Sequence, residues 1–212
     1  MDYIQFQKNL GNQLVFTLQD IRLYESTFRP QTLYGWIRLG YVTRLTRGFY
    51  VHNSEHKRRN EFHLYSIANR IYEPSYISLE SALSYYHLIP DVVMSITSIS
   101  ARKTTEFTTS IARFSYKSVK PVMMNGYTTT QFEGTSFTMA TKEKAIIDYL
   151  YLHPELKTPG DMHEIRINID ELFSDFKEDN YWMYARIAES ETLEKRAKVF
   201  LEYWRNPTYV QY

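Results

Sequence analysis

The chain has 212 residues, of which 43% are hydrophobic and 16% aromatic, and its formal net charge is +1. This length suits one large domain or a small module joined to a larger one, and nineteen tyrosines with twelve phenylalanines argue against a disordered chain. No run of eighteen apolar residues occurs, so we expect no transmembrane helix, and the absence of cysteine excludes disulfides, thiolate metal sites and a cysteine nucleophile.

Two short helices are predicted at the start of the chain. The first covers residues 2–10, where Tyr3, Phe6 and Leu10 recur at i, i+3 and i+7. A short extended piece follows at residues 14–16. Thr17 is the predicted N-cap of the second helix, because its hydroxyl precedes an apolar-periodic stretch with an acid three residues later.

A third helix is predicted to begin at Arg29-Pro30, since proline in the first helical turn loses no hydrogen bond. Its two faces differ in chemistry at 100° per residue. The face expected to point inward carries Leu33, Trp36, Ile37 and Gly40. The opposite face carries Gln31, Tyr34, Gly35 and Arg38.

Two β-rich runs, residues 41–45 and 49–51, flank a turn at Thr46-Arg47-Gly48 and predict a hairpin. Helix, turn, helix and hairpin in this order predict a winged helix-turn-helix that binds duplex DNA. Residues 1–60 hold nine basic and four acidic side chains, a net +5, whereas the remainder is −4. This basic segment favours a polyanionic partner. The candidate DNA-binding residues are Arg29, Gln31, Tyr34, Arg38, Arg44, Arg47, Lys57 and Arg58.

Beyond residue 60 the sequence predicts an α+β body, residues 61–212. Residues 56–59 are expected to open a helix that ends before Glu73-Pro74. Residues 92–139 are β-rich and predict a small antiparallel sheet. A helix capped by Thr141 follows, with Lys142, Glu143 and Asp148 expected on its outer side. Its inward positions are expected to be Ala145, Ile146, Tyr149 and Leu152.

Thr158-Pro159-Gly160 is the clearest linker signal. The last helix carries one apolar stripe, at Leu193, Ala197, Phe200, Leu201 and Trp204. We therefore predict three parts: a winged helix-turn-helix over residues 1–60, a mixed α/β domain with the small sheet over 61–157, and a helical extension packed on it over 158–212.

Enzyme motifs are missing from the sequence. It holds no phosphate-cradling glycine loop, no G-x-S-x-G elbow and no H-E-x-x-H zinc motif. His52 and His56 lack a third ligand, and Asp161 and Glu164 are the nearest candidates for a carboxylate pair. We expect a non-enzymatic protein without metal or cofactor. The acidic second residue and the lack of an apolar leader predict no secretory signal, which favours the cytoplasm.

Five blocks in order resemble the AbiEi-type antitoxins, the regulator halves of type IV toxin–antitoxin systems. The blocks cover about residues 15–152, and they are Gly40 to Tyr50, Tyr76 to Leu83, Leu88-Ile89-Pro90, Ile96 to Ile99 and Ala140 to Ala145. The resemblance implies a winged helix that represses its own operon and a body that neutralises a nucleotidyltransferase toxin encoded next door. The Gly-Ser then Asp-x-Asp signature of such a toxin is absent here.

The expected partners are the chain's own operator DNA and the cognate toxin, with no membrane partner, and we expect a monomer or a weak dimer. The toxin is expected to contact residues 92–139 and the outer side of the helix after Thr141.

Two alternative functions remain open. One is a transcription factor whose body binds a small ligand, which an apolar pocket in the body would favour. The other is a protein–protein adaptor whose winged helix no longer touches DNA.

Overall fold

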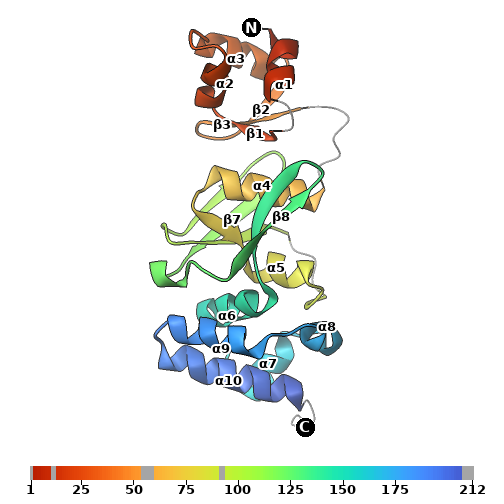
Figure 1. Cartoon of the computed structure of the whole chain (residues 1–212), viewed down its shortest axis with the longest axis vertical. Helices are drawn as coiled ribbons and strands as arrows, with labels where there is room; N and C mark the ends of the chain where they lie inside the picture. The colour runs from red at the N-terminus through yellow and green to blue at the C-terminus, as the bar shows by residue number, and fades with distance from the viewer. Residues whose placement is uncertain (1, 11–12, 54–59, 91–93, 207–212) are drawn as a thin grey trace.

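The computed structural model describes residues 2–10, 13–53, 60–90 and 94–206. The chain is a mixed α+β protein with two β-sheets arranged in tiers (Figure 1). Helices and a three-stranded sheet form the N-terminal end, a six-stranded sheet forms the middle, and a group of helices forms the C-terminal end. The candidate residues Lys57 and Arg58, and His56, lie outside the described residues.

The N-terminal unit, residues 1–60, alternates helices with short strands. Its elements are α1 (Tyr3–Leu10), β1 (Val15–Phe16), α2 (Leu18–Tyr24), α3 (Pro30–Arg38), β2 (Val42–Thr46) and β3 (Phe49–His52). The three strands form an antiparallel sheet in the order β1-β3-β2. The predicted three helices and hairpin are therefore present.

Local signals explain where these helices begin. Thr17 caps α2 through a capping box, in which its hydroxyl accepts from the Asp20 backbone N–H and the Asp20 carboxylate accepts from the Thr17 N–H. Pro30 occupies the first turn of α3, as predicted. The α3 helix ends at Arg38, so Gly40 lies beyond it, exposed and with a positive φ, rather than on the inward face as expected.

The body begins with α4 (Glu61–Ile71), which is capped by Asn60. The predicted helix start at residues 56–59 lies outside the described residues. The elements between α4 and the C-terminal helices are β4 (Ser75–Ile77), α5 (Leu79–Tyr85), β5 (Ile96–Ser100), β6 (Thr105–Thr108), β7 (Arg113–Ser118), the short 3₁₀ helix η1 (Pro121–Met123), β8 (Tyr127–Phe132) and β9 (Thr135–Ala140). The α4 helix lies on the side of the sheet nearer the N-terminal unit, and α5 lies on the other side (Figure 1).

The predicted sheet is present, but it is mixed rather than purely antiparallel, and β4 joins it from outside the region that was predicted to be β-rich. The sheet has six strands in the order β6-β7-β5-β4-β9-β8. The β4–β9 and β5–β7 pairs are parallel, and the other three pairs are antiparallel. Strand β4, from the Tyr76 block, lies in the interior of this sheet between β5 and β9. Parallel pairs join strands that are distant in sequence, which alternation along a single strand does not reveal.

The C-terminal helices are α6 (Lys142–Leu152), α7 (Pro159–Glu164), α8 (Ile169–Phe173), α9 (Glu178–Ile187) and α10 (Glu191–Arg205). The predicted linker at Thr158-Pro159-Gly160 is instead the start of α7, with Thr158 and Asp161 forming a capping box. The apolar stripe predicted for the last helix is buried in α10. Among the described helices, none combines the length and apolar character that crossing a membrane requires.

Candidate nucleic-acid interface

The N-terminal unit has an aromatic core that orients α3. The Trp36 ring stacks on Phe6 at 5.0 Å between centroids and contacts Phe28 at 5.2 Å, and Phe6 meets Phe16 edge-on at 4.9 Å. Leu33, one turn earlier on α3, is 2% exposed. Burial of such large side chains is the main source of stability in a unit of this size. One face of α3 is therefore anchored in the core.

The opposite face of α3 is presented to solvent. Gln31, Tyr34 and Arg38 are all exposed, and Tyr34 keeps 61% of its surface. Tyr34 lies three residues after Gln31 and four before Arg38, so the three side chains share one side of the helix. Arg29, the N-cap residue of α3, is also exposed. The structure thus brings these four predicted residues together on one helix and its first turn.

The β2–β3 hairpin carries the other two described candidates. Arg44 is exposed on β2, and its Nε donates to the Thr46 carbonyl at 3.3 Å, which holds the side chain along the hairpin. Arg47 is exposed in the turn beside Gly48, whose φ of +86° suits glycine. Within the described part of the chain, no carboxylate forms an ion pair with either arginine or with those of α3.

A set of contacts missed by sequence reasoning holds the hairpin against the end of α3. The Asn53 side chain donates to the Gly40 carbonyl at 3.1 Å and accepts from the Thr43 hydroxyl at 2.8 Å. The Tyr3 ring stacks on Tyr41 at 4.7 Å, and its hydroxyl donates to the Tyr41 carbonyl. Asn53 precedes a serine, a typical loop pair, so no local signal indicated this positioning role.

The N-terminal unit meets the body across α4. Val15, Leu45 and Val51 belong to the same buried cluster as the body core. The Arg70 guanidinium of α4 lies 3.7 Å from the Asp20 carboxylate of α2 and 3.1 Å from Glu73. This junction is therefore partly apolar and partly ionic.

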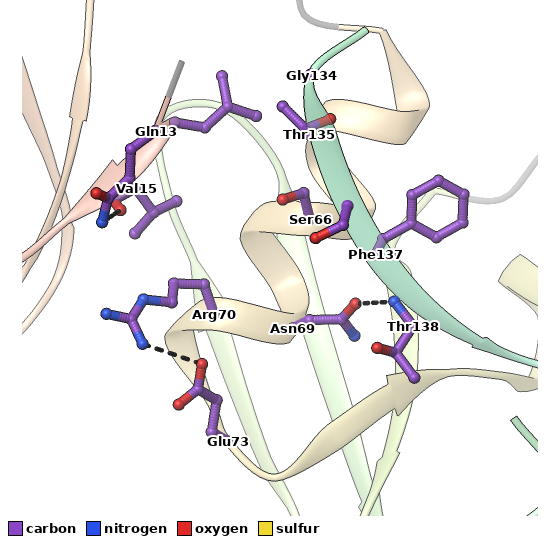
Figure 2. Close-up of a pocket in the computed structure, with 12 residues that line it drawn as sticks. Gln13, Val15, Ser66, Asn69, Arg70, Glu73, Gly134, Thr135, Phe137 and Thr138 are labelled. Carbon is purple, nitrogen blue, oxygen red and sulfur yellow. Dashed lines mark hydrogen bonds and ion pairs between the residues drawn. The ribbon is translucent and has the colours of Figure 1, made fainter. Parts of the chain in front are cut away.

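A cavity of about 380 Å³ opens at this junction (Figure 2). One wall comes from residues 13–15 of the N-terminal unit, and the others come from α4 and from residues 134–138 at the start of β9. Polar groups line much of it, including Ser66, Asn69 and the Arg70–Glu73 pair. The side-chain amide oxygen of Asn69, Oδ1, already accepts from the Thr138 N–H at 2.6 Å.

The first turn of α6, from the Ala140 to Ala145 block, is buried, so the prediction that Lys142, Glu143 and Asp148 face outward was wrong. Lys142 Nζ donates to the Glu171 carbonyl at 2.6 Å and pairs with Asp175, which follows α8. The Glu143 carboxylate accepts from the Lys177 N–H at 2.7 Å, just before α9. These two charged residues join α6 to the C-terminal helices.

Lys144 and Asp148 form an ion pair within the core of the body. Asp148 is 0% and Lys144 1% exposed. The Asp148 carboxylate also accepts from the hydroxyls of Tyr76 at 2.9 Å and Ser78 at 2.8 Å, and Lys144 Nζ donates to the Tyr76 oxygen at 2.9 Å. Burial raises the pKa of Asp148, and the Lys144 ammonium opposes that shift. This network links α6 to β4, two of the blocks that carry the family resemblance.

The remaining candidate catalytic and metal-binding residues, Asp161 and His52, make contacts that stabilise the fold. Asp161 accepts from the backbone N–H groups of Lys157 and Thr158, which lowers the pKa of its carboxyl, so it caps α7. His52 packs against the rings of Phe6 and Phe16. No group of three histidine or acidic residues in the described ranges is placed to bind a metal ion.

Comparison of the chain with models of protein families and with curated proteins finds no match.

Proposed function

We propose that this protein binds duplex DNA through the N-terminal unit, with α3 in the major groove and the β2–β3 hairpin as a wing. The observation that carries the proposal is the division of α3 into two faces. Leu33 and Trp36 anchor one face, and the other presents Gln31, Tyr34 and Arg38 to solvent. A helix held in this way projects its polar side chains as a rigid set, which recognition of base edges requires.

Each exposed side chain suits a different contact with DNA. Arg38 and Gln31 can each form two hydrogen bonds with a base edge, arginine with guanine and glutamine with adenine. The Tyr34 hydroxyl and Arg29, nearer the start of α3, suit phosphate oxygens. Arg44 and Arg47 on the hairpin suit phosphates or the minor groove. Among the described candidates, the four arginines supply the positive charge that DNA attracts.

Replacement of Arg38 and Arg47 separates base recognition from phosphate contact. Arg38→Ala should weaken binding to the preferred operator by about 1–3 kcal/mol and reduce the preference for that sequence, because one base edge loses its partner. Arg47→Ala should weaken binding to all duplexes by a similar factor. Fluorescence anisotropy with an operator and a scrambled duplex measures both effects. Arg186→Ala, an exposed arginine on α9 at the other end of the molecule, is the matched control. Equal losses on both duplexes for Arg38→Ala would contradict the assignment of α3.

We further propose that the protein is the antitoxin of a type IV toxin–antitoxin system, repressing its own operon and neutralising a nucleotidyltransferase toxin. The ordered blocks that resemble AbiEi-type antitoxins support this role. The burial of Lys142, Glu143 and Asp148 removes them from the candidate toxin-contact surface. The exposed parts of residues 94–139 remain as the candidate contact surface.

Neutralisation of the toxin should not require DNA binding, because the N-terminal unit is basic and the body, at −4, is not. We expect the full chain with Arg38→Ala and Arg47→Ala to restore growth of cells that express the adjacent-gene toxin as fully as the wild type does. Expression from an unrelated promoter keeps the protein level independent of autorepression. Loss of rescue in the double variant, at an unchanged protein level, would show that toxin neutralisation depends on the DNA-binding surface.

The junction cavity favours a second candidate function, a regulator whose DNA binding responds to a small ligand. Its volume falls in the range of ligand sites. Its lining, however, is largely polar and partly occupied by the Asn69–Thr138 and Arg70–Glu73 contacts. A second and more apolar cavity, of about 480 Å³, lies within the body beside Pro159 of α7 and Val199 and Tyr203 of α10, and it also favours ligand sensing. The antitoxin role is the preferred proposal because five ordered blocks of the sequence support it.

A further inference from the structure

Strand β8 forms one edge of the body sheet, and within the described residues only β9 pairs with it. Its sequence is Tyr-Thr-Thr-Thr-Gln-Phe, without a charge or a proline. Tyr127, Thr128, Thr129 and Gln131 are exposed. An edge strand of this kind is a template for another strand, because its outward N–H and C=O groups have no ladder partner.

The hairpin geometry identifies which backbone groups of β8 point outward. Phe132 pairs with Thr135 across a two-residue turn whose Glu133 and Gly134 both have positive φ, as a type I′ turn requires. Residues that flank such a turn form a hydrogen-bonded pair, and such pairs then alternate along the ladder. The bond from the Thr141 N–H to the Gly126 carbonyl, at 2.8 Å, agrees with this alternation. The outward groups therefore belong to residues 127, 129 and 131.

The opposite edge of the sheet is protected in a way that β8 is not. Strand β6 has four residues, and exposed Glu106 on it pairs with Arg113 of β7 at 3.2 Å. A charge on a short edge strand disfavours further pairing. The two edges therefore differ, and β8 is the longer and the uncharged one.

We propose that β8 pairs antiparallel with β8 of a second copy of this chain, about a two-fold axis at Thr129. In this arrangement residue 129 faces its own counterpart and residue 127 faces residue 131 of the partner. The outward groups of these three residues then form hydrogen-bonded pairs across the axis. The two body sheets become one continuous sheet of twelve strands.

The side chains of β8 suit its own copy as the occupant. Threonine lies opposite threonine at the axis and on either side of it, because residue 128 faces residue 130 of the partner. Such cross-strand threonine pairs are favourable. Glu133 would face Asn125 of the partner rather than another acid, so no like charges meet along the strand. Because the sequence of β8 is neutral and complementary to itself, we choose a second copy of the chain as its partner. This proposal does not depend on DNA binding or on the toxin.

A charge placed at the axis tests the arrangement in the full chain. Thr129→Lys brings two ammonium groups together across the two-fold axis, and Thr129→Glu does the same with two carboxylates. We expect the wild type to dimerise and each variant alone to have a dimer dissociation constant at least about tenfold higher. Mixing the two variants should restore the dimer, because lysine then faces glutamate. Thr108→Lys, at an exposed position on the opposite edge strand β6, should leave dimerisation unchanged.

Sedimentation velocity over a concentration series measures the dimer, with circular dichroism to show that each variant folds. A chain that stays monomeric up to near-millimolar concentration overturns the proposal. A dimer that both Thr129 variants leave intact also overturns it, as does a mixture that fails to re-form. If the wild type is monomeric and Thr129→Lys instead prevents binding of the adjacent-gene toxin, the occupant of this edge is a strand of that toxin and not a second copy.

Discussion

Raising the salt concentration from roughly 50 to 200 mM should weaken binding of duplex DNA by about 10²- to 10³-fold. This expectation assumes that four or five phosphates are neutralised, by Arg29, Arg44 and Arg47 with residues 57 and 58 as further candidates. Each neutralised phosphate releases a condensed counterion, so the logarithm of the binding constant falls linearly with the logarithm of the salt concentration, with a slope of about −0.9 per contact.

The slope of this salt dependence is proportional to the number of phosphate contacts, so it shows how many arginines contact phosphate. Removing Arg44 and Arg47 together should make it shallower by about two contacts, whereas Arg186→Ala on α9 should leave it unchanged. Titration of a labelled operator at several salt concentrations provides the measurement. If the binding constant of the wild type does not change with salt concentration, the proposed DNA binding is wrong. If the double variant has the same slope as the wild type, the phosphate contacts are not on the hairpin.

Truncation of Asp148 should lower the free energy of unfolding by about 3–5 kcal/mol, because it leaves the Lys144 ammonium buried without a counterion. The hydroxyls of Tyr76 and Ser78 would lose their shared acceptor as well. Chemical denaturation followed by tryptophan fluorescence measures the loss. For comparison, Glu202→Ala removes the exposed Lys198–Glu202 pair, which has the same i,i+4 spacing, and should cost less than about 1 kcal/mol.

A double variant separates the ion pair from the rest of the network. Lys144→Met with Asp148→Asn removes both charges and keeps an amide that the two hydroxyls can contact. We expect it to be considerably more stable than Asp148→Ala, because the largest penalty in the single variant comes from the unpaired charge rather than from the lost pair. If the double variant is as unstable as the single one, the network stabilises the fold by its hydrogen bonds and shape and not by charge pairing.

The N-terminal unit could be predicted closely from the sequence. Thr17 with Asp20, Pro30 and Gly48 act over a few residues, so their effect on helix starts and on the turn is visible in the sequence. The alternation of Leu33 and Trp36 with Gln31 and Arg38 separates two faces of α3. The candidate DNA-binding residues Gln31, Tyr34 and Arg38 follow from that separation. The hydrogen bonds of Asn53 that hold the hairpin could not be predicted in this way.

The body was predicted less well because its decisive contacts are distant in sequence. Strand alternation indicates that a segment is a strand, and it does not specify the partner or the direction of pairing. The parallel pairing of Ile77 with Met139 joins residues 62 positions apart. The predicted linker is a helix start for another reason. Thr158, Pro159 and Asp161 are typical of helix starts as well as of turns, and packing against α10 favours the helix.

In α6, local sequence signals account for the helix, whereas tertiary packing accounts for the burial of its charged residues. The sequence determined that a helix follows Thr141 and that Ala145 and Ile146 face inward, because capping and helical periodicity are local. It assigned Lys142, Glu143 and Asp148 to solvent, since charged residues are seldom fully buried. In the structure α6 contacts α5, α9, α10 and β9, so little of the helix remains exposed to solvent. A buried charge is stable only beside its partners. For Asp148 two of these are the hydroxyls of Tyr76 on β4 and of Ser78 directly after it, about seventy residues earlier in the chain.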